Sequence, residues 1–163
     1  MRMTGGKTQR WIAAVVVFLA VVAWAPTARA QKEPDGLFTA SKEQLAVVKV
    51  VLMQESAWNR GNLDEFLESY KVAPETQAII GGSVRGMANI KSAYHINYPN
   101  RDSMGVIAYS NVEARELGEN FALATGKYHL DRPKRAGGSA EGTFTLIMEK
   151  TLIGWKIIFS ETT

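Results

Sequence analysis

The sequence predicts an α+β domain in which three N-terminal helices pack on a strongly bent antiparallel sheet. Three observations support this fold class. Apolar residues recur at helical spacing in the first part of the domain, the last sixty residues alternate between apolar and polar in the manner of strands, and short turn-like segments separate the strands. Helices that precede a run of strands are typical of α+β domains, whose helices cover one face of the sheet.

Residues 1–30 have the composition of a cleavable secretory signal. Three basic residues precede an uncharged stretch at residues 11–25, and a small-x-small motif at residues 28–30 precedes Gln31. A retained membrane anchor is the alternative, but fifteen helical residues reach only about 22 Å, short of the roughly 30 Å hydrocarbon core. We therefore expect an exported protein, periplasmic or secreted, with no membrane association after cleavage.

Charge and cysteine content exclude several function classes. Four of the 19 basic residues and none of the 16 acidic ones lie within residues 1–30, which leaves 15 basic against 16 acidic residues and a net charge of −1. A near-neutral chain is not expected to bind nucleic acid. The chain contains no cysteine, so disulfides, thiolate metal sites and cysteine nucleophiles are excluded, and the domain depends on its core.

The first predicted helix follows a mobile polar lead-in, residues 31–40, that contains Pro and Gly. Ser41 and Gln44 form a capping-box pattern, in which each side chain can satisfy a backbone N–H of the first turn. Gly61 ends the helix, because glycine readily adopts the left-handed conformation. The expected apolar face comprises Leu45, Val47, Val48, Val51, Leu52 and Trp58.

Two further helices are predicted before the strands begin. Asn62 and Glu65 repeat the capping pattern and start a short helix that ends before Pro74. Residues 76–80 are a short β-prone run, and residues 87–97 form the third helix. Because the second helix starts at Asn62, directly after Gly61, the chain turns a tight corner after its first helix.

Four long strands complete the predicted domain, and their length has a consequence. They span residues 104–114, 120–131, 139–150 and 155–162. Strands longer than the usual five or six residues tend to bend, often at glycine, and Gly126 and Gly142 stand where such bends are needed. A bent sheet that wraps around helices encloses an internal pocket.

Four short motifs resemble the NTF2-like superfamily, and within it the DUF4440 and SnoaL-like group. They are residues 57–63 (AWNRGNL), 85–90 (RGMANI), 142–146 (GTFTL) and 154–158 (GWKII). The resemblance implies a cone-shaped fold over residues 41–163 and a homodimer formed through the outer face of the sheet. The last strand of the family commonly ends in Asp-His-Thr-Ser, whereas this chain ends in Ser-Glu-Thr-Thr.

Histidine and basic residues give no specific motif. His95 and His129 fall in different elements without metal-ligand spacing, so we expect neither a metal site nor a cofactor. Residues 132–135 (RPKR) form a small basic cluster that is typical of a solvated loop, with an anionic surface partner as the alternative.

No catalytic residue is assigned, but pocket candidates can be named. Fold relatives pair a carboxylate base with phenol donors, and Glu161 is the acid that strand alternation places on the face of Trp155 and Ile157. A solvated C-terminal residue is the alternative for Glu161. The pocket candidates are Trp58, Tyr70, Tyr94, Tyr98, Tyr109, Tyr128, His129, Trp155 and Glu161.

Two functions follow from these expectations. The first is an exported domain that binds a small apolar or amphipathic molecule in its pocket, acts as a dimeric interaction module, or does both. The second is an enzyme similar to the SnoaL-like and ketosteroid isomerase families, which performs acid–base chemistry in the same pocket.

Overall fold

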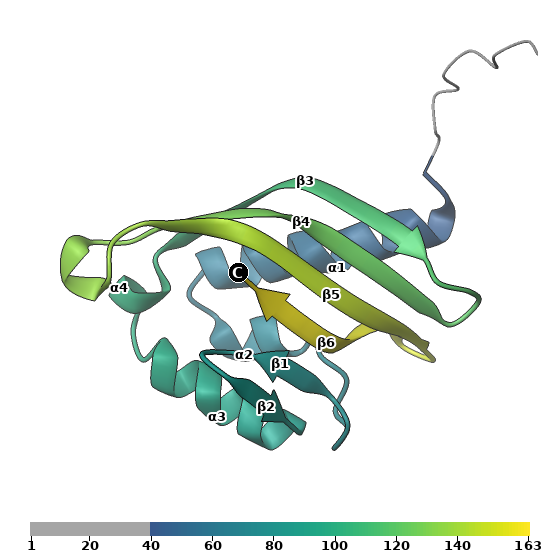
Figure 1. Ribbon diagram of the computed structural model, residues 1–163, viewed down its shortest axis with the longest axis horizontal. Helices are drawn as coiled ribbons and strands as arrows, with labels where there is room; N and C mark the ends of the chain where they lie inside the picture. Colours follow the sequence, from purple (N-terminus) through teal and green to yellow (C-terminus); the bar gives the residue numbers. More distant parts are fainter. Residues whose placement is uncertain (1–39) are drawn as a thin grey trace, which may run out of the picture. The chain divides into compact units, whose positions relative to one another are not determined.

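The computed structural model describes residues 40–163, and it has the predicted α+β architecture (Figure 1). The signal predicted for residues 1–30 and nearly all of the lead-in predicted for residues 31–40 lie outside the described residues. The helices are α1 (Lys42–Asn59), α2 (Leu63–Leu67), α3 (Met87–Asn97) and α4 (Arg101–Met104), with a single 3-10 turn, η1 (Lys134–Ala136). In this part of the chain no helix is both long and apolar enough to cross a membrane.

The sheet has six strands in the order β2-β1-β6-β5-β4-β3. These are β1 (Gln77–Ile79), β2 (Ser83–Arg85), β3 (Val106–Glu116), β4 (Phe121–Asp131), β5 (Ala140–Thr151) and β6 (Gly154–Thr162). Strands β3 to β6 form the predicted antiparallel meander. The sheet as a whole is mixed, because β1 pairs in parallel with β6. The purely antiparallel sheet of the prediction is corrected in this respect.

Helix α1 lies across one face of the sheet, and its N-terminus is formed as the sequence predicts. The Ser41 side chain accepts a hydrogen bond from the Gln44 N–H, and the Gln44 side chain accepts one from the Ser41 N–H. The buried stripe is narrower than expected, since it contains Val47 and Val51 but leaves Leu45 and Leu52 more than half exposed. One sheet is too small a partner to cover the whole apolar face.

The end of α1 is fixed to the start of β3 by polar side chains. Trp58 Nε1 donates to the Met104 carbonyl over 2.9 Å, and the Asn59 amide both donates to and accepts from the backbone of Ile107. Arg101 donates to the carbonyl oxygens of Trp58 and Asn59 in the last turn of the helix, where the usual intrahelical donors end. These contacts set the distance between α1 and the sheet.

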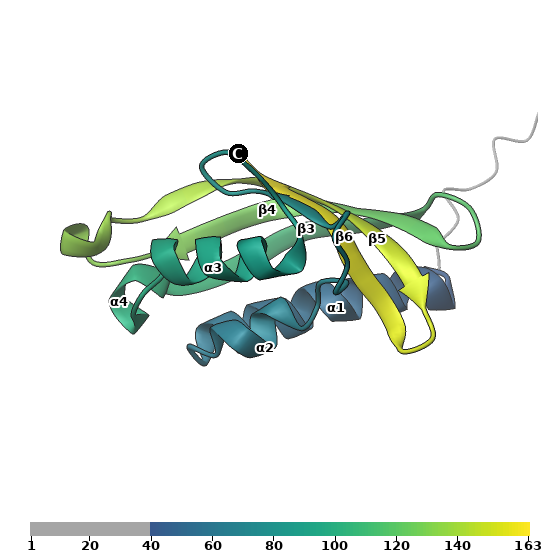
Figure 2. The same ribbon diagram turned by 90° about the horizontal axis from the view of Figure 1, so that it is seen from below.

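The sheet curls around α1, α2 and α3 (Figure 2), and two irregularities accompany the curl. In β3 the register shifts between Ser110 and Glu113, where Asn111 has a φ of 52°. In β6 Ile158 is the extra residue, because Ile147 pairs with Phe159 while Met148 pairs with Ile157. Gly126, where the sequence predicts a bend, has a different role. A Cβ at Gly126 would lie 2.6 Å from the Phe144 ring, so glycine permits close packing there.

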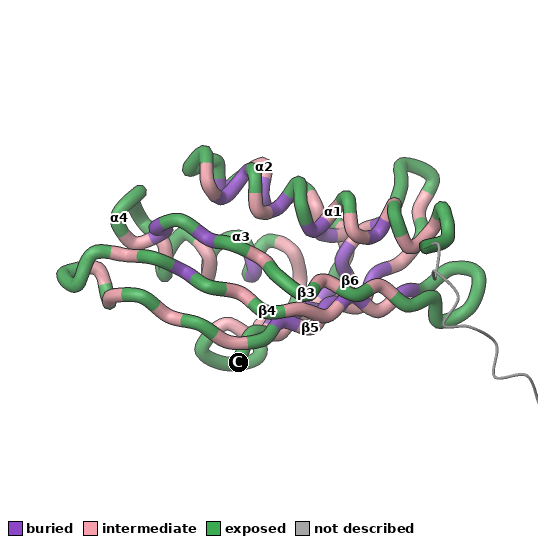
Figure 3. Tube along the Cα trace, turned by 90° about the horizontal axis from the view of Figure 1, so that it is seen from above, coloured by how far each residue is buried: buried purple, intermediate pink, exposed green. Residues whose placement is uncertain are grey.

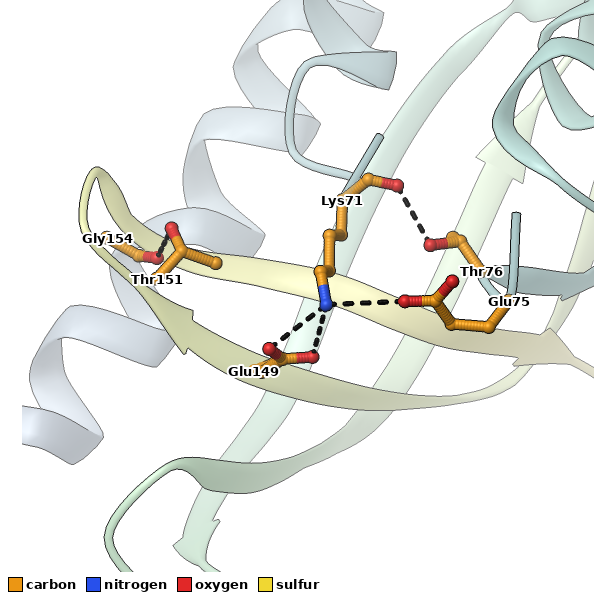
Figure 4. A network of polar contacts seen from close by, with 6 residues as sticks. All are labelled: Lys71, Glu75, Thr76, Glu149, Thr151 and Gly154. Atoms are coloured by element: carbon orange, nitrogen blue, oxygen red, sulfur yellow. Dashed lines mark hydrogen bonds and ion pairs between the residues drawn. The ribbon is translucent and has the colours of Figure 1, made fainter. Parts of the chain in front are cut away.

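The core lies between the helices and the concave face of the sheet, where buried segments face one another (Figure 3). The connection from α2 to β1 is tied to the sheet by Lys71, whose ammonium contacts the carboxylates of Glu149 at 2.8 Å and Glu75 at 3.4 Å (Figure 4). Thr76 donates to the Lys71 carbonyl and closes the same segment. This network holds α2 and its side chains against the sheet.

Candidate functional site

A cavity of about 160 Å³ lies between the helices and the concave face of the sheet. Its walls come from α1, α2, α3 and strands β3 to β6, and they are mostly aromatic or aliphatic. The lining residues are Trp58, Phe66, Tyr94, Tyr98, Ile107, Tyr109, Tyr128, Leu130, Arg132, Ala140 and Thr162. A second cavity of about 30 Å³ adjoins it and shares Phe66, Tyr94, Tyr109 and Thr162. We regard the two as the outer and inner parts of one site.

The aromatic wall is a set of rings in mutual contact. Trp58 packs edge-to-face against Tyr98 and Phe66, with ring centroids 4.7 and 5.2 Å apart. Tyr94 stacks on Tyr98 at 6.0 Å and contacts Phe66 edge-on at 5.3 Å. Such pairs restrict ring rotation and contribute beyond their buried area, so this wall is preorganised for an apolar ligand.

A chain of hydroxyl groups crosses the inner cavity. The Tyr70 phenol donates to Ser160 Oγ over 2.9 Å, and it lies 3.0 Å from the Tyr94 phenol. Tyr70 comes from the end of the α2 segment, Tyr94 from α3 and Ser160 from β6. The extra residue in β6 turns Ser160, instead of Phe159 or Glu161, into this buried position.

The phenols of the site are held in the neutral form. Burial raises the pKa of Tyr70 and of Tyr109, and it raises that of Tyr94 well above its usual value. Burial also raises the pKa of Tyr98, an effect that the nearby charge of Arg132 partly offsets. These groups therefore remain hydrogen-bond donors at neutral and mildly alkaline pH.

Gln54 is a buried polar residue of the inner cavity. Its side chain is 3% exposed, and among residues 40–163 its Nε2 makes no hydrogen bond of regular geometry, although the amide is close enough to the Tyr70 phenol to favour the ionised form of that group. An unpaired donor in such a position costs on the order of 1–3 kcal/mol, so its presence needs a reason. The free N–H groups enlarge the set of donors that the cavity presents.

The structure brings seven of the nine predicted pocket residues to the two cavities. Trp58, Tyr94, Tyr98, Tyr109 and Tyr128 line the larger one, while Tyr70 and Glu161 line the smaller, together with the shared Tyr94 and Tyr109. His129 lies instead on the outer face of the sheet, 3.8 Å from the Glu141 carboxylate. Trp155 is buried under the N-terminus of α1, where its Nε1 donates to Glu43.

Sequence reasoning missed six polar or aromatic residues of the site. They are Gln54, Phe66, Arg132, Phe144, Ser160 and Thr162. The sequence could have indicated Gln54, because it falls on the buried α1 stripe with Val47, Val51 and Trp58, where a polar residue is unusual. No sequence pattern indicates Ser160, because the irregularity in β6 that buries it depends on the pairing of β6 with β5.

Two larger depressions, of about 340 and 590 Å³, lie on the outside beside the β5–β6 hairpin. They share Glu68, Ile153 and Lys156, and exposed or charged side chains form much of their walls. Within residues 40–163 no group of three metal-ligating side chains comes together. The cavity lined by packed aromatic rings is therefore the stronger candidate for a specific ligand.

Solved structures provide the comparison with known proteins, because neither a family model nor a curated protein matches the chain. An NTF2-like protein of unknown function from Shewanella oneidensis shares 30% identity with a TM-score of 0.65, and the match covers 72% of this chain and 95% of that one. An uncharacterized protein with a cystatin-like fold from Caulobacter vibrioides shares 21% identity with a TM-score of 0.62, over 76% and 89% of the two chains.

A third similar structure is a nuclear transport factor 2-like superfamily protein from Salmonella enterica. It shares 17% identity with a TM-score of 0.58, and the match covers 73% of this chain and 88% of that chain. At this identity the likeness shows the fold alone. The Shewanella protein, in contrast, is similar in sequence over almost its whole length, and its fold matches this one. This chain belongs to the NTF2-like superfamily.

Proposed function

We propose that this protein binds a small, mostly apolar molecule that carries a hydrogen-bond acceptor. The observation that supports the proposal is the cavity of about 160 Å³, whose wall combines packed aromatic rings with neutral phenols. Apolar surface favours the body of the ligand through the hydrophobic effect, and the phenol O–H groups favour an acceptor such as a carbonyl or hydroxyl oxygen.

The volume limits the size of the ligand. An apolar cavity of about 150 Å³ in another protein holds benzene. A cavity of about 160 Å³ therefore suits one six-membered ring or a short branched chain. Larger molecules would require the side chains of α3 and β4, among them Tyr98 and Tyr128, to move apart.

A second function, acid–base catalysis, has one observation in its favour. The half-buried Glu161 lies at the wall of the inner cavity with Tyr70 and Tyr94. A carboxylate there could take a proton from a carbon next to a carbonyl group, while a phenol donates a hydrogen bond to the enolate oxygen, and then return the proton to a different carbon. This assignment to the SnoaL-like or DUF4440 group stands second, because Ser160-Glu161 replaces the Asp-His pair that commonly ends the last strand of the family.

We also propose that the protein is exported and that it forms a homodimer. The signal-like residues 1–30 support export, and N-terminal sequencing of the mature protein should then begin at Gln31. Of the four isoleucines that the sequence offers for the outer face, Ile147 and Ile158 are half-buried and would pack in a dimer. The other two, Ile79 and Ile107, line the cavities instead. Sedimentation as a monomer at micromolar concentration would contradict the dimer.

Ligand binding can be tested by filling the cavity. Benzyl alcohol serves as the probe, with ¹H–¹⁵N NMR spectra of the purified protein as the measurement. The variant Ala140→Leu places three extra carbon atoms at the cavity wall, so we expect it to abolish the shifts that the probe causes in wild type. The matched control is Ala108→Leu, at an exposed position of β3. Binding that survives Ala140→Leu, or no binding to wild type, would overturn the proposal.

A further inference from the structure

Arg132 is the one charged residue among residues 40–163 that lines the larger cavity. It follows β4 directly, and its half-buried side chain forms part of the cavity wall. Two glycines from other parts of the chain, Gly105 and Gly137, lie against the Arg132 side chain. A Cβ at Gly105 would collide with the Arg132 stem, and one at Gly137 would lie 3.3 Å from its Nη2. Both glycines have positive φ, which glycine adopts readily, and neither has a Cβ that would occupy the space of the Arg132 side chain.

The guanidinium is oriented, yet its charge is not neutralised. Arg132 Nε donates to the Gly138 carbonyl over 3.0 Å, which fixes the plane of the group. Within residues 40–163 no carboxylate forms an ion pair with Arg132, and its two terminal nitrogens make no hydrogen bond. The adjacent Asp131 accepts a hydrogen bond from Ser139 instead, and the neighbouring Arg135 pairs with Asp102.

Two phenols stand beside this charge. Tyr98 and Tyr128 line the same cavity as Arg132, whose positive charge partly offsets the rise that burial causes in the pKa of Tyr98. A guanidinium presents parallel N–H donors that match the two oxygens of a carboxylate, and a phenol can add a further donor to either oxygen. No carboxylate side chain lines the larger cavity to compete for this position.

From this arrangement we infer that the ligand of the cavity is a small carboxylic acid with a ring-sized apolar body, and that Arg132 binds its carboxylate. The inference rests on the proposed function, and it adds the charge and the orientation of the ligand. The ring lies against Trp58 and Tyr98, and the carboxylate points to the rim. An apolar cavity with one unpaired arginine favours a monoanion over a neutral molecule of equal size.

Three probes of one size separate this inference from the proposed function. Benzoate carries the carboxylate, while benzamide and benzyl alcohol keep the ring and an oxygen acceptor without the charge. For wild type we expect benzoate to bind at least tenfold more tightly than benzamide, measured by NMR titration at low salt. Added salt should weaken benzoate binding and leave benzyl alcohol binding unchanged, because only the first contact is ionic.

Substitution of the arginine gives the second test. Arg132→Gln retains a polar side chain without the charge, so we expect benzoate affinity to fall about tenfold and benzyl alcohol affinity to stay the same. Arg135→Gln removes a charge from the same loop and is the matched control, with no expected change in benzoate affinity. The probe series on wild type needs no variant, so it decides the question even if Arg132→Gln folds poorly.

The outcomes distinguish the two proposals. If benzyl alcohol binds in the cavity and benzoate binds no more tightly than benzamide, the carboxylate inference is overturned while the proposed function stands. The carboxylate inference is also overturned if benzoate binds wild type and Arg132→Gln equally tightly, or if Arg135→Gln loses as much benzoate affinity as Arg132→Gln does. If none of the three probes binds wild type, the proposed function fails, and the inference fails with it.

Discussion

The Tyr70 phenol donates a 2.9 Å hydrogen bond to the Ser160 hydroxyl and thereby joins the α2 segment to the last strand of the sheet. Both residues are buried, at 2% and 5% exposure. The pair therefore combines two functions in one contact, since it forms part of the wall of the inner cavity and links two layers of the fold.

We expect Tyr70→Phe and Ser160→Ala each to lower the free energy of unfolding by about 1 kcal/mol, because each removes the buried hydrogen bond between the two hydroxyl groups. The double variant should lose less than the sum, with a coupling of about 0.5–1 kcal/mol. Urea denaturation of the four proteins measures the cycle. Additive losses would show that the hydrogen bond contributes nothing to stability.

Arg101 should stabilise the fold by capping the end of α1. Its guanidinium donates to the carbonyl oxygens of Trp58, Asn59 and Gly105. We expect Arg101→Gln to lower the free energy of unfolding by about 1–2 kcal/mol, because backbone acceptors lose charged donors. The control is Arg115→Gln, at an exposed position of β3 without such contacts. Equal effects of the two substitutions would argue against the capping role.

Alkaline pH should reveal the buried phenols. Burial raises the pKa of Tyr70, Tyr94, Tyr98 and Tyr109 in the folded state, whereas an unfolded tyrosine titrates near pH 10. The folded state thus keeps protons that the unfolded state releases, so stability should be complete below about pH 10 and fall as the pH rises further. Absorbance at 295 nm should show delayed ionisation in the folded protein. Full ionisation near pH 10 without unfolding would contradict this.

Acidic pH should weaken a contact at the other end of α1. Glu43 accepts hydrogen bonds from Lys150 and Trp155, which together lower its pKa. Its contribution is present above the ordinary pKa of a glutamate, about 4.3, and is lost as the pH falls through the lower folded value.

The variant Glu43→Gln tests this contact, because it keeps an acceptor for Trp155 but removes the charge opposite Lys150. Its deficit in stability at pH 7 should vanish in the acid range, when wild-type Glu43 is also neutral. Glu113→Gln, at an exposed site on β3, provides the control. A deficit that persists unchanged at pH 2 would exclude the ionic contribution.

The unpaired amide of Gln54 leads to a prediction of opposite sign. We expect Gln54→Met to raise the free energy of unfolding by about 1 kcal/mol, because an apolar side chain of similar length removes a buried donor without a partner. Thermal melts and urea denaturation give the measurement. A clear loss of stability would mean that the amide contributes to the folded state in a way that its contacts do not show.

Local chemistry made much of this fold predictable. The caps at Ser41 and Asn62 depend only on residues three positions away. The full capping box formed at Ser41, whereas at Asn62 only the hydrogen bond from the Glu65 N–H to the Asn62 side chain formed. Helix α3 coincides with the predicted residues 87–97, because its apolar spacing and flanking Gly86 and Pro99 define it. The strands of the meander agree within about two residues.

Features that depend on distant partners were not predictable. Strand β2 is three residues long and exists through its pairing with β1, and α4 is a single turn that Asn100 caps. The extra residue in β6 gave Ser160 the buried position that simple alternation assigns to Glu161, and it left Glu161 half-buried at the wall of the inner cavity. Arg132 looked like part of a solvated basic loop until the structure placed it beside the cavity.

The parallel pairing of β1 with β6 bears on the order of folding. Gln77 pairs with Phe159, and Ala78 with Ser160, so neighbours in the middle of the sheet come from opposite ends of the domain. Strand β1 and its partner β2 have no other neighbour to join the sheet, and they must wait until the final strand is present. Such long-range contacts slow folding. During synthesis, β1 and β2 would therefore remain apart from the rest of the sheet until the last residues of β6 are present. The inner cavity needs Ser160, so it would be the last part of the molecule to close.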